Sequence, residues 1–324
     1  MQPLAFVQLV QTELEQVEDL LAAQADGYHQ DLQAALRHLL QAGGKRLRPV
    51  VALLMGRLLT APIDRLIILA AALEMLHTAT LVHDDLIDGA LLRRGIPTLN
   101  ARWSPAATVL TGDFLFARAA KLATDTGSLH VMDLFTRTLA VIVDGEIRQL
   151  FEGGAYTTLE QYERRIYAKT ASMFELATAA AASLAGYPPD HGPYETARRY
   201  GYHIGMAFQI IDDILDYVGD SRHVGKPVGN DLRNGLITLP ALYYLEEHPD
   251  DPDLRFVLEE GNLFDEARLQ ALVERIRSSG AIARAAEQAR AHVAQALAAL
   301  EALPASPERE ALAELARYVT ERTF

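Results

Sequence analysis

The sequence predicts an all-α protein on three observations: its composition, its apolar periodicity and its lack of strand-like segments. Good helix formers such as Ala, Leu, Glu and Arg dominate its 324 residues, and half of the residues are hydrophobic, enough for a large core. Apolar side chains recur three and four residues apart over long stretches. No clear run of alternating β-branched residues indicates a sheet, and no stretch of about 18 uncharged apolar residues predicts a membrane span.

The expected helices follow one another closely along the chain. Helical periodicity covers residues 4–22, 31–41, 64–87, 106–123, 128–152, 159–185, 194–219, 237–247, 265–302 and 307–321. Short turns rich in Gly or Pro separate many of them, and none resembles an interdomain linker. We therefore expect one domain over residues 1–324, with its chemical motifs within 40–240 and the helices of 250–324 packed against that part.

Charge and cysteine content narrow the classes of function. The formal net charge of −13 disfavours nucleic acid and anionic lipid as partners. Cysteine is absent, which excludes disulfides, thiolate metal ligands and cysteine nucleophiles. The first residues lack a basic region followed by an apolar core, so we expect no signal peptide and a cytoplasmic protein.

Two acidic clusters of identical pattern, Asp-Asp-x-x-Asp, lie inside apolar helical runs. They consist of Asp84, Asp85 and Asp88, and of Asp212, Asp213 and Asp216. The first and last members are four residues apart, so they project from one face of a helix and repel unless a cation lies between them. Carboxylates suit Mg²⁺, which also takes water and phosphate oxygens. One cluster could be a solvated acidic face, but two in apolar surroundings favour a metal–phosphate site.

Cations accompany both clusters, as a site for diphosphates requires. Gly43 and Gly44 precede Lys45, Arg46 and Arg48; glycines permit close approach of the backbone, and the Arg fork matches phosphate oxygens. The other polar candidates are His77, two turns before the first cluster, Arg93 and Arg94 after it, Lys169 and Thr170 within a helix, and Lys226 after the second cluster. Each alone could be structural. Together they favour diphosphate binding.

These segments resemble the trans-isoprenyl diphosphate synthases, or polyprenyl synthetases. The matching stretches are GGKRLRP (43–49), HTATLVHDDLIDGALLRRGIPT (77–98), GDFLFA (112–117), KTAS (169–172), FQIIDDILDYVGD (208–220) and GKPVGNDLRNGLITLP (225–240). They occur in the family's order. The resemblance implies the isoprenoid synthase fold, roughly a dozen helices around a deep central cavity, and a homodimer. The departures, Gly89-Ala90 and Leu236, fall on no implied ligand.

The resemblance also implies a role for each site residue. The implied Mg²⁺ ligands, for about three ions in each active site, are Asp84, Asp88 and Asp212, supported directly or through water by Asp85, Asp213 and Asp216. The implied ligands of isopentenyl diphosphate are Lys45, Arg48, His77 and Arg94. The implied ligands of the allylic diphosphate are Arg93, Lys169, Thr170, Gln209 and Lys226. Lys169 and Arg93 complete the catalytic set.

The implied chemistry agrees with these residue types. Metal and cations stabilise the negative charge that grows on the departing diphosphate. The double bond of isopentenyl diphosphate attacks the allylic cation, and a proton is then lost to the released diphosphate. No protein nucleophile is needed, and an apolar cavity keeps water from the cation.

Small residues one turn before Asp84 predict a long product. In the family, bulk at this place limits chain growth, and short-chain synthases tend to have an aromatic residue there; here it is occupied by Ala79 and Thr80. We therefore expect an all-trans polyprenyl diphosphate longer than geranylgeranyl, of the kind that becomes a quinone tail. The alternative is that both residues only pack against a neighbouring helix, that a bulky residue elsewhere, Leu76 or a phenylalanine on the adjacent helix, closes the cavity, and that the product is farnesyl or geranylgeranyl diphosphate.

Three other classes of protein fit the sequence less well. A terpene cyclase normally has a second metal motif with Asn/Asp, Ser/Thr and Glu, and needs no isopentenyl site. A di-iron bundle needs Glu-x-x-His twice, and only Glu74-x-x-His77 is present. A non-catalytic subunit of a heteromeric synthase usually lacks one or both acidic clusters, whereas both are intact here.

Overall fold

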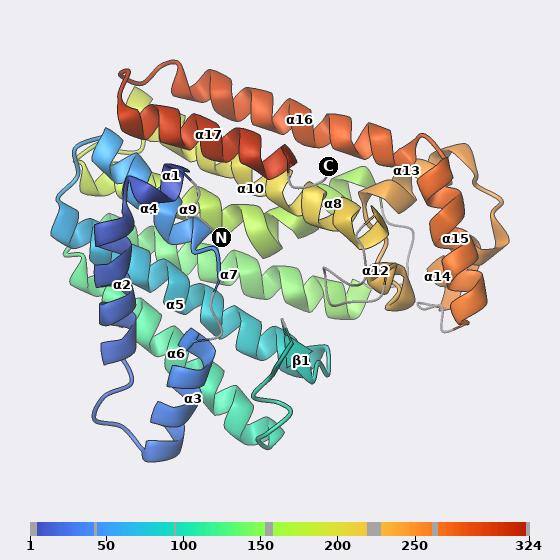
Figure 1. Ribbon diagram of the computed structural model, residues 1–324, viewed down its shortest axis with the longest axis horizontal. Helices are drawn as coiled ribbons and strands as arrows, with labels where there is room; N and C mark the ends of the chain where they lie inside the picture. The colour runs from blue at the N-terminus through green and yellow to red at the C-terminus, as the bar shows by residue number, and fades with distance from the viewer. Residues whose placement is uncertain are drawn as a thin grey trace. The chain divides into compact units, whose positions relative to one another are not determined.

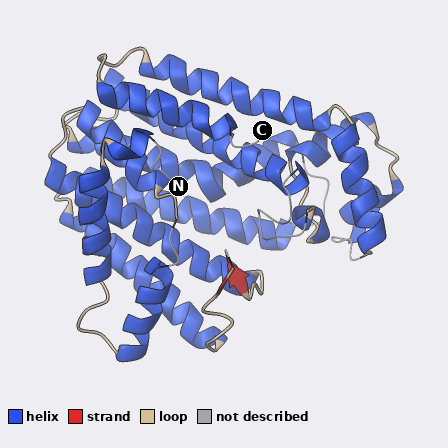
Figure 2. Cartoon of the chain, in the orientation of Figure 1, coloured by secondary structure: helices blue, strands red, loops and turns tan. Residues whose placement is uncertain are grey.

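The protein is helical, as the sequence predicts, in a computed structural model that describes residues 5–41, 44–93, 95–152, 158–218, 228–260 and 265–321. Within these residues the only strands are β1 (Leu92–Arg93) and β2 (Ile96–Pro97), which pair antiparallel across Gly95 (Figure 2). The helices, labelled in Figure 1, are α1 (Ala5–Gln8), α2 (Gln11–Ala23), α3 (Gln30–Gln41), α4 (Leu47–Leu58), α5 (Ile63–Ile87), α6 (Pro105–Asp125), α7 (Leu129–Glu152), α8 (Leu159–Ile166), the π-helix η1 (Tyr167–Ala171), α9 (Ser172–Leu184), α10 (Gly192–Val218), α12 (Asn230–Arg233), α13 (Leu239–Glu247), α14 (Pro252–Glu260), α15 (Glu266–Ser278), α16 (Ala281–Leu300) and α17 (Pro307–Glu321).

Local signals in the sequence explain where several helices begin. Ser104 caps α6, whose first residue is a proline. Thr158 and Gln161 form a reciprocal capping box at the start of α8. Asp265 accepts two backbone N–H groups at the start of α15. Each cap satisfies donors that the first helical turn leaves without a partner.

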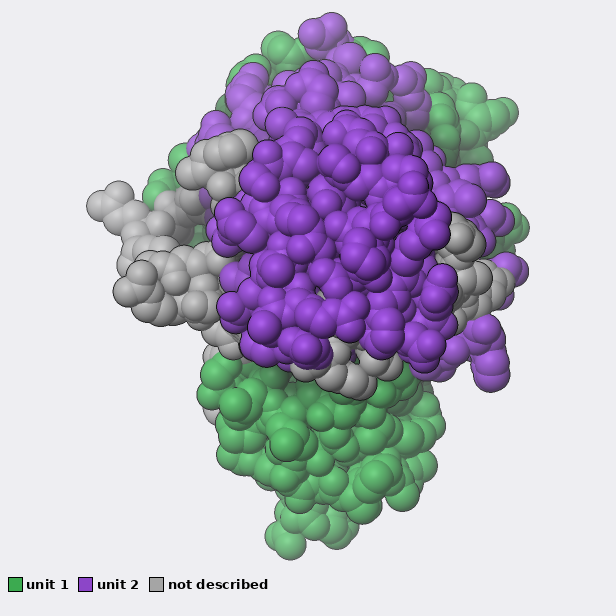
Figure 3. Space-filling model, turned by 90° about the vertical axis from the view of Figure 1, so that its right-hand side faces the viewer, with its two compact units in different colours: residues 1–137, 176–198, 302–312 green, residues 138–175, 199–301, 313–324 purple. Residues whose placement is uncertain are grey.

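The chain forms two compact units, coloured separately in Figure 3. The first unit comprises residues 1–137, 176–198 and 302–312. Its central helix is α5, which packs against α2, α4 and α6. Among the described helices, α5 alone is long and apolar enough to cross a membrane, but 67% of its most apolar window is buried inside the protein. It is therefore a core helix.

The second unit comprises residues 138–175, 199–301 and 313–324. Here α13 packs against α8, α15 and α16, and α14 packs against α15. The helices α7, α9, α10 and α17 each have residues in both units. The single domain expected for 1–324 stays a prediction.

The helix bounds differ from the predicted ones in a few places. The sequence pattern did not predict α4, α12 or α14, and it treated 265–302 as continuous, whereas Ser279 and Gly280 separate α15 from α16. In α4 the apolar run continues helically through Gly56. This glycine has a packing role, because a Cβ atom there would lie 2.2 Å from Cδ2 of Leu66 on α5.

Candidate active site

The first acidic cluster lies at the carboxyl end of α5. Asp84 is half-buried and Asp88, the residue that caps the helix, is exposed, whereas Asp85 is only 6% exposed. The carboxylate of Asp85 forms an ion pair with Arg93. The Arg93 Nε donates to Asp85 Oδ1 at 2.8 Å, and Nη2 lies 2.8 Å from the same oxygen. The structure therefore separates the cluster into one buried carboxylate and two, four residues apart, that share the other face of the helix.

The segment after this cluster, residues 90–93 and 95–98, is held by hydrogen bonds and a tight turn. Gly95 has a φ of +77°, which permits the tight turn between β1 and β2. The Thr98 hydroxyl donates to the Ala90 carbonyl at 2.7 Å, and the His38 ring nitrogen lies 2.8 Å from the Pro97 carbonyl. Arg93 is thus held in place beside α5. Its predicted neighbour Arg94 lies outside the described residues.

The glycine-rich segment before α4 supplies two predicted ligands of isopentenyl diphosphate. Lys45 is exposed and Arg48, in the first turn of α4, is half-buried. His77 is half-buried on α5, and its carbonyl accepts the Thr80 hydroxyl at 2.8 Å. These residues and the first cluster all belong to the first unit. Their ligand roles stay predictions.

The predicted chain-length residues lie one turn before Asp84. Ala79 is fully buried and Thr80 is half-buried. Leu76, named as an alternative source of bulk, is also fully buried. The neighbouring helix comes close, because a Cβ on Gly112 of α6 would lie 2.2 Å from the His83 ring. This gives the glycine of the GDFLFA segment a packing role.

The second cluster lies near the carboxyl end of α10. Asp212 and Asp216 are half-buried, and Asp213 is 4% exposed. Asp213 accepts a hydrogen bond from the Tyr162 hydroxyl and another from the Gln209 amide, each at 2.8 Å. Burial, together with the negative charge of Asp231, raises the pKa of Asp213 to about 7. As in the first cluster, the middle aspartate is held by the protein.

Asp216 closes a turn. Its two carboxylate oxygens accept the backbone N–H groups of Asn230 and Asp231 at 3.2 and 3.1 Å, and its carbonyl accepts the Gly229 N–H at 2.9 Å. These contacts anchor the start of α12 on the end of α10. Lys226, predicted to bind the allylic diphosphate, lies outside the described residues.

Lys169 and Thr170 lie in the π-helix η1, in the second unit. The Thr170 hydroxyl donates to Gln209 Oε1 at 2.5 Å, so two predicted ligands are in direct contact. Lys169 is half-buried. Single π-turns within α-helices occur frequently at functional sites.

Two glycines leave room for this π-turn. A Cβ on Gly205 of α10 would lie 2.4 Å from Cα of Ala171, and one on Gly145 of α7 would lie 2.5 Å from Cβ of Ala168. Larger residues would push these helices away from η1.

Sequence reasoning missed Tyr162 and the contacts of Arg93 and Asp216. Tyr162 lies 51 residues from Asp213 and matches no local motif. A helical tyrosine before Lys169 is indistinguishable, in sequence alone, from an ordinary core residue. Only its hydrogen bond to Asp213 of α10 identifies its role.

Both clusters present hard carboxylate oxygens, the kind of donor that a divalent metal such as Mg²⁺ takes. Within the described residues, no group of three or more His, Asp or Glu side chains converges as a metal site. The clusters instead offer hard carboxylate oxygens at i and i+4. Mg²⁺ commonly binds through one or two carboxylates and takes its remaining ligands from water and phosphate.

Comparisons with known proteins agree with this chemistry. A model of the polyprenyl synthetase family matches residues 29–276. The octaprenyl diphosphate synthase of Escherichia coli is 38% identical over 290 residues, 88% of each chain. The all-trans-nonaprenyl-diphosphate synthase (geranyl-diphosphate specific) of Rhodobacter capsulatus is 40% identical over 291 residues, 88% of this chain and 87% of that one. The crystal structure of a polyprenyl synthase from Caulobacter crescentus, complexed with calcium and isoprenyl diphosphate, superposes with a TM-score of 0.92 at 37% identity, covering 98% of this chain and 97% of that one.

Proposed function

This chain belongs to the polyprenyl synthetase family, and from that premise we propose that it joins isopentenyl diphosphate to an allylic diphosphate, head to tail. The product is an all-trans polyprenyl diphosphate longer than geranylgeranyl. The observation that carries this proposal is the similarity, over most of the chain, to the octaprenyl and nonaprenyl synthases. The small, buried Ala79 one turn before Asp84 supports it independently.

Each predicted ligand has a role in this reaction. Lys45, Arg48, His77 and Arg94 hold isopentenyl diphosphate. Arg93, Lys169, Thr170, Gln209 and Lys226 hold the allylic diphosphate. The proposed metal ligands are Asp84, Asp88 and Asp212, and the native ion is Mg²⁺, about three in each active site. When bound, Mg²⁺ neutralises charge on the diphosphate oxygens.

The reaction needs positioning and charge stabilisation more than covalent participation by the protein. The allylic carbon–oxygen bond breaks, and its electron pair leaves with the diphosphate, whose growing charge Lys169 and Arg93 stabilise. The isopentenyl double bond attacks the allylic cation and forms the new carbon–carbon bond. A proton then passes to the released diphosphate. Asp213, held by Tyr162 and Gln209, keeps Gln209 in contact with Thr170.

Three broader properties complete the proposal. The two units act as one domain, because α7, α9, α10 and α17 each continue from one unit into the other. The protein is cytoplasmic. It is also a homodimer, which is supported by an exposed apolar face on α7. This face is defined by four residues at helical spacing, Val143, Ile147, Leu150 and Phe151, which are 43%, 48%, 58% and 85% exposed.

A product-length assay tests the function directly. The full chain is incubated with farnesyl diphosphate, labelled isopentenyl diphosphate and Mg²⁺, and the dephosphorylated products are separated by length. We expect chains longer than geranylgeranyl. Products that stop at farnesyl or geranylgeranyl would contradict the long-chain assignment. Failure to consume isopentenyl diphosphate would favour a non-catalytic subunit.

A further inference from the structure

Arg46 is more deeply buried than Lys45, the cation that precedes it. Lys45 is exposed, but the Arg46 side chain is only 14% exposed. Its Nε donates to Oε1 of Glu18 at 2.6 Å, its Nη1 to Oε1 of Glu74, and its Nη2 to the Leu40 carbonyl at 3.1 Å. The sequence groups Arg46 with phosphate-binding cations, but its guanidinium donates hydrogen bonds to two carboxylates and a carbonyl of the protein.

These contacts join four elements of the first unit. Glu18 belongs to α2, Leu40 to α3 and Glu74 to α5, and Arg46 itself is the residue that precedes α4. A planar guanidinium with five donors can satisfy several acceptors at once, which an ammonium group does less well. Arg46 therefore fixes the start of α4 relative to α5.

The backbone of Arg46 requires such support. Its φ of 46° and ψ of 34° place it in the left-handed region, which is unfavourable for a residue with a Cβ atom and favours glycine. Conformations of this kind persist where the surroundings hold them, and they cluster at functional sites. The ion pairs of Arg46 stabilise this conformation. Arg46 lies directly between Lys45 and the first turn of α4.

Glu74 is the buried end of the arrangement. Its side chain is 7% exposed, and a buried carboxylate is costly without a cation. Burial alone would lower the pKa of the Arg46 guanidinium, but Glu74 and Glu18 raise it above its ordinary value, so the guanidinium stays charged. Glu74 precedes His77 by three residues on α5, so both lie on one side of that helix.

We propose that Arg46 and Glu74 are positioning residues for isopentenyl diphosphate. Their ion pair holds the left-handed turn that sets Lys45 and Arg48 relative to His77. Neither residue touches the substrate. The inference rests on the proposed function, because that function assigns isopentenyl diphosphate to Lys45, Arg48 and His77.

Two substitutions separate the side chain of Arg46 from its backbone conformation. Arg46→Gly keeps the left-handed turn accessible but removes the ion pair, and Glu74→Gln removes the charge of the partner while keeping its shape. We expect both to raise the KM for isopentenyl diphosphate by about tenfold or more, because misplacing ligands by even an ångström is costly. The KM for the allylic substrate should change little. Arg46→Lys, a milder change, should give an intermediate effect.

Arg57 offers a matched control. It also bridges elements of the first unit, donating to the Leu9 carbonyl at 2.7 Å, to Glu13 at 3.0 Å and to Glu308 at 3.1 Å. Arg57→Gln should lower the melting temperature but leave the ratio of the two KM values unchanged. A general loss of stability cannot produce the selective effect expected for Arg46 and Glu74.

The outcomes distinguish this inference from the function beneath it. Wild-type protein that consumes no isopentenyl diphosphate would contradict the proposed function itself. Active wild type with an unchanged KM in folded Glu74→Gln and Arg46→Lys would overturn the positioning role. So would full activity of Arg46→Gly, or an equal rise in KM for Arg57→Gln. Titration calorimetry with isopentenyl diphosphate gives the same comparison without turnover.

Discussion

In both acidic clusters the middle aspartate is the buried one, and a side chain from another element binds it. Arg93 binds Asp85, whereas Tyr162 and Gln209 bind Asp213. In each case the first aspartate of the cluster is only half-buried. The repeated motif thus has two roles: metal binding is the proposed role, and linking the helix to another element is the observed one.

A single side chain should decide product length. Ala79→Phe adds a ring at a fully buried position one turn before Asp84, so we expect the longest product to shorten by at least one isoprene unit. Product chromatography checks this, with the melting temperature measured to establish that the variant folds. Ala79→Ser, nearly isosteric, is the control and should keep the wild-type length. Unchanged length in a folded Ala79→Phe variant would locate the floor of the cavity elsewhere, for example at Leu76.

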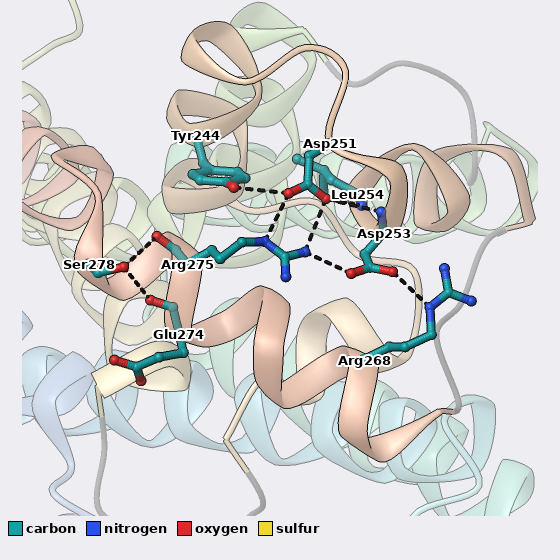
Figure 4. Close-up of polar contacts among 8 residues, drawn as sticks. All are labelled: Tyr244, Asp251, Asp253, Leu254, Arg268, Glu274, Arg275 and Ser278. Carbon is teal, nitrogen blue, oxygen red and sulfur yellow. Dashed lines mark hydrogen bonds and ion pairs between the residues drawn. The ribbon is translucent and has the colours of Figure 1, made fainter.

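At the scale of elements, a charged cluster joins α14 and α15 (Figure 4). Arg275 of α15 donates to Asp251 at 2.9 Å and to Asp253 at 2.7 Å, and Tyr244 donates to Asp251 at 2.9 Å. Arg268 adds a second contact to Asp253 at 2.7 Å. Burial would raise the pKa of both aspartates. The Leu254 N–H, Arg275 and Tyr244 together lower the pKa of Asp251, and Arg275 and Arg268 together lower that of Asp253, so both pKa values lie below the ordinary range.

This cluster should make stability depend on pH. The folded pKa values are depressed, so its contribution is present above the ordinary aspartate pKa of about 4 and is lost as pH falls below it. Arg275→Gln should lower the free energy of unfolding by about 1–2 kcal/mol at pH 7, a figure reduced for the partial exposure of Arg275. The difference from wild type in urea unfolding should shrink below about pH 4.

A neighbouring surface pair provides the control for that experiment. Arg255 and Asp250 lie 2.7 Å apart, but their side chains are 49% and 86% exposed. Arg255→Gln should therefore have a much smaller effect. An Arg275→Gln deficit that stays constant from pH 7 to pH 3 would show that lost packing, not charge, is responsible.

Most helices could be predicted from periodicity because each buries one face in the core. Two elements that periodicity did not predict depend on residues outside their own segment. The π-turn η1 requires Gly145 and Gly205 on other helices, and α12 requires the carboxylate of Asp216. For the site, composition and spacing predicted the aspartates and the cations, and their ligand roles stay predictions. Composition and spacing could not separate Arg46, which faces carboxylates, from Lys45, which is exposed.

At the scale of the whole molecule, the apolar face of α7 should determine the oligomeric state. We expect the full chain to sediment at twice its mass of 35.6 kDa, because this face is a poor surface for a monomer. Leu150→Asp combined with Phe151→Asp should shift the mass toward the monomer. Analytical ultracentrifugation measures this.

The control for the mass measurement is a lone exposed apolar residue. Ile63→Asp places a carboxylate in the first turn of α5, where it suits the helix dipole, and should leave the mass unchanged. A monomeric wild-type chain, or a dimer unaffected by the double substitution, would contradict the role of α7.

The π-turn η1 also determines the direction in which Thr170 points relative to Tyr162, which lies on the preceding helix α8. Tyr162 and Thr170 are eight residues apart, so in a continuous α-helix their directions would differ by about 80°. The π-turn accommodates one extra residue, which removes about 100° of rotation. The directions of Tyr162 and Thr170 therefore differ by only about 20°. Both side chains then reach α10, Tyr162 at Asp213 and Thr170 at Gln209, which are themselves one turn apart. Deleting a residue of η1 that precedes Thr170 would change the relative direction of Tyr162 and Thr170 and break one of these contacts, although every residue that makes them would still be present.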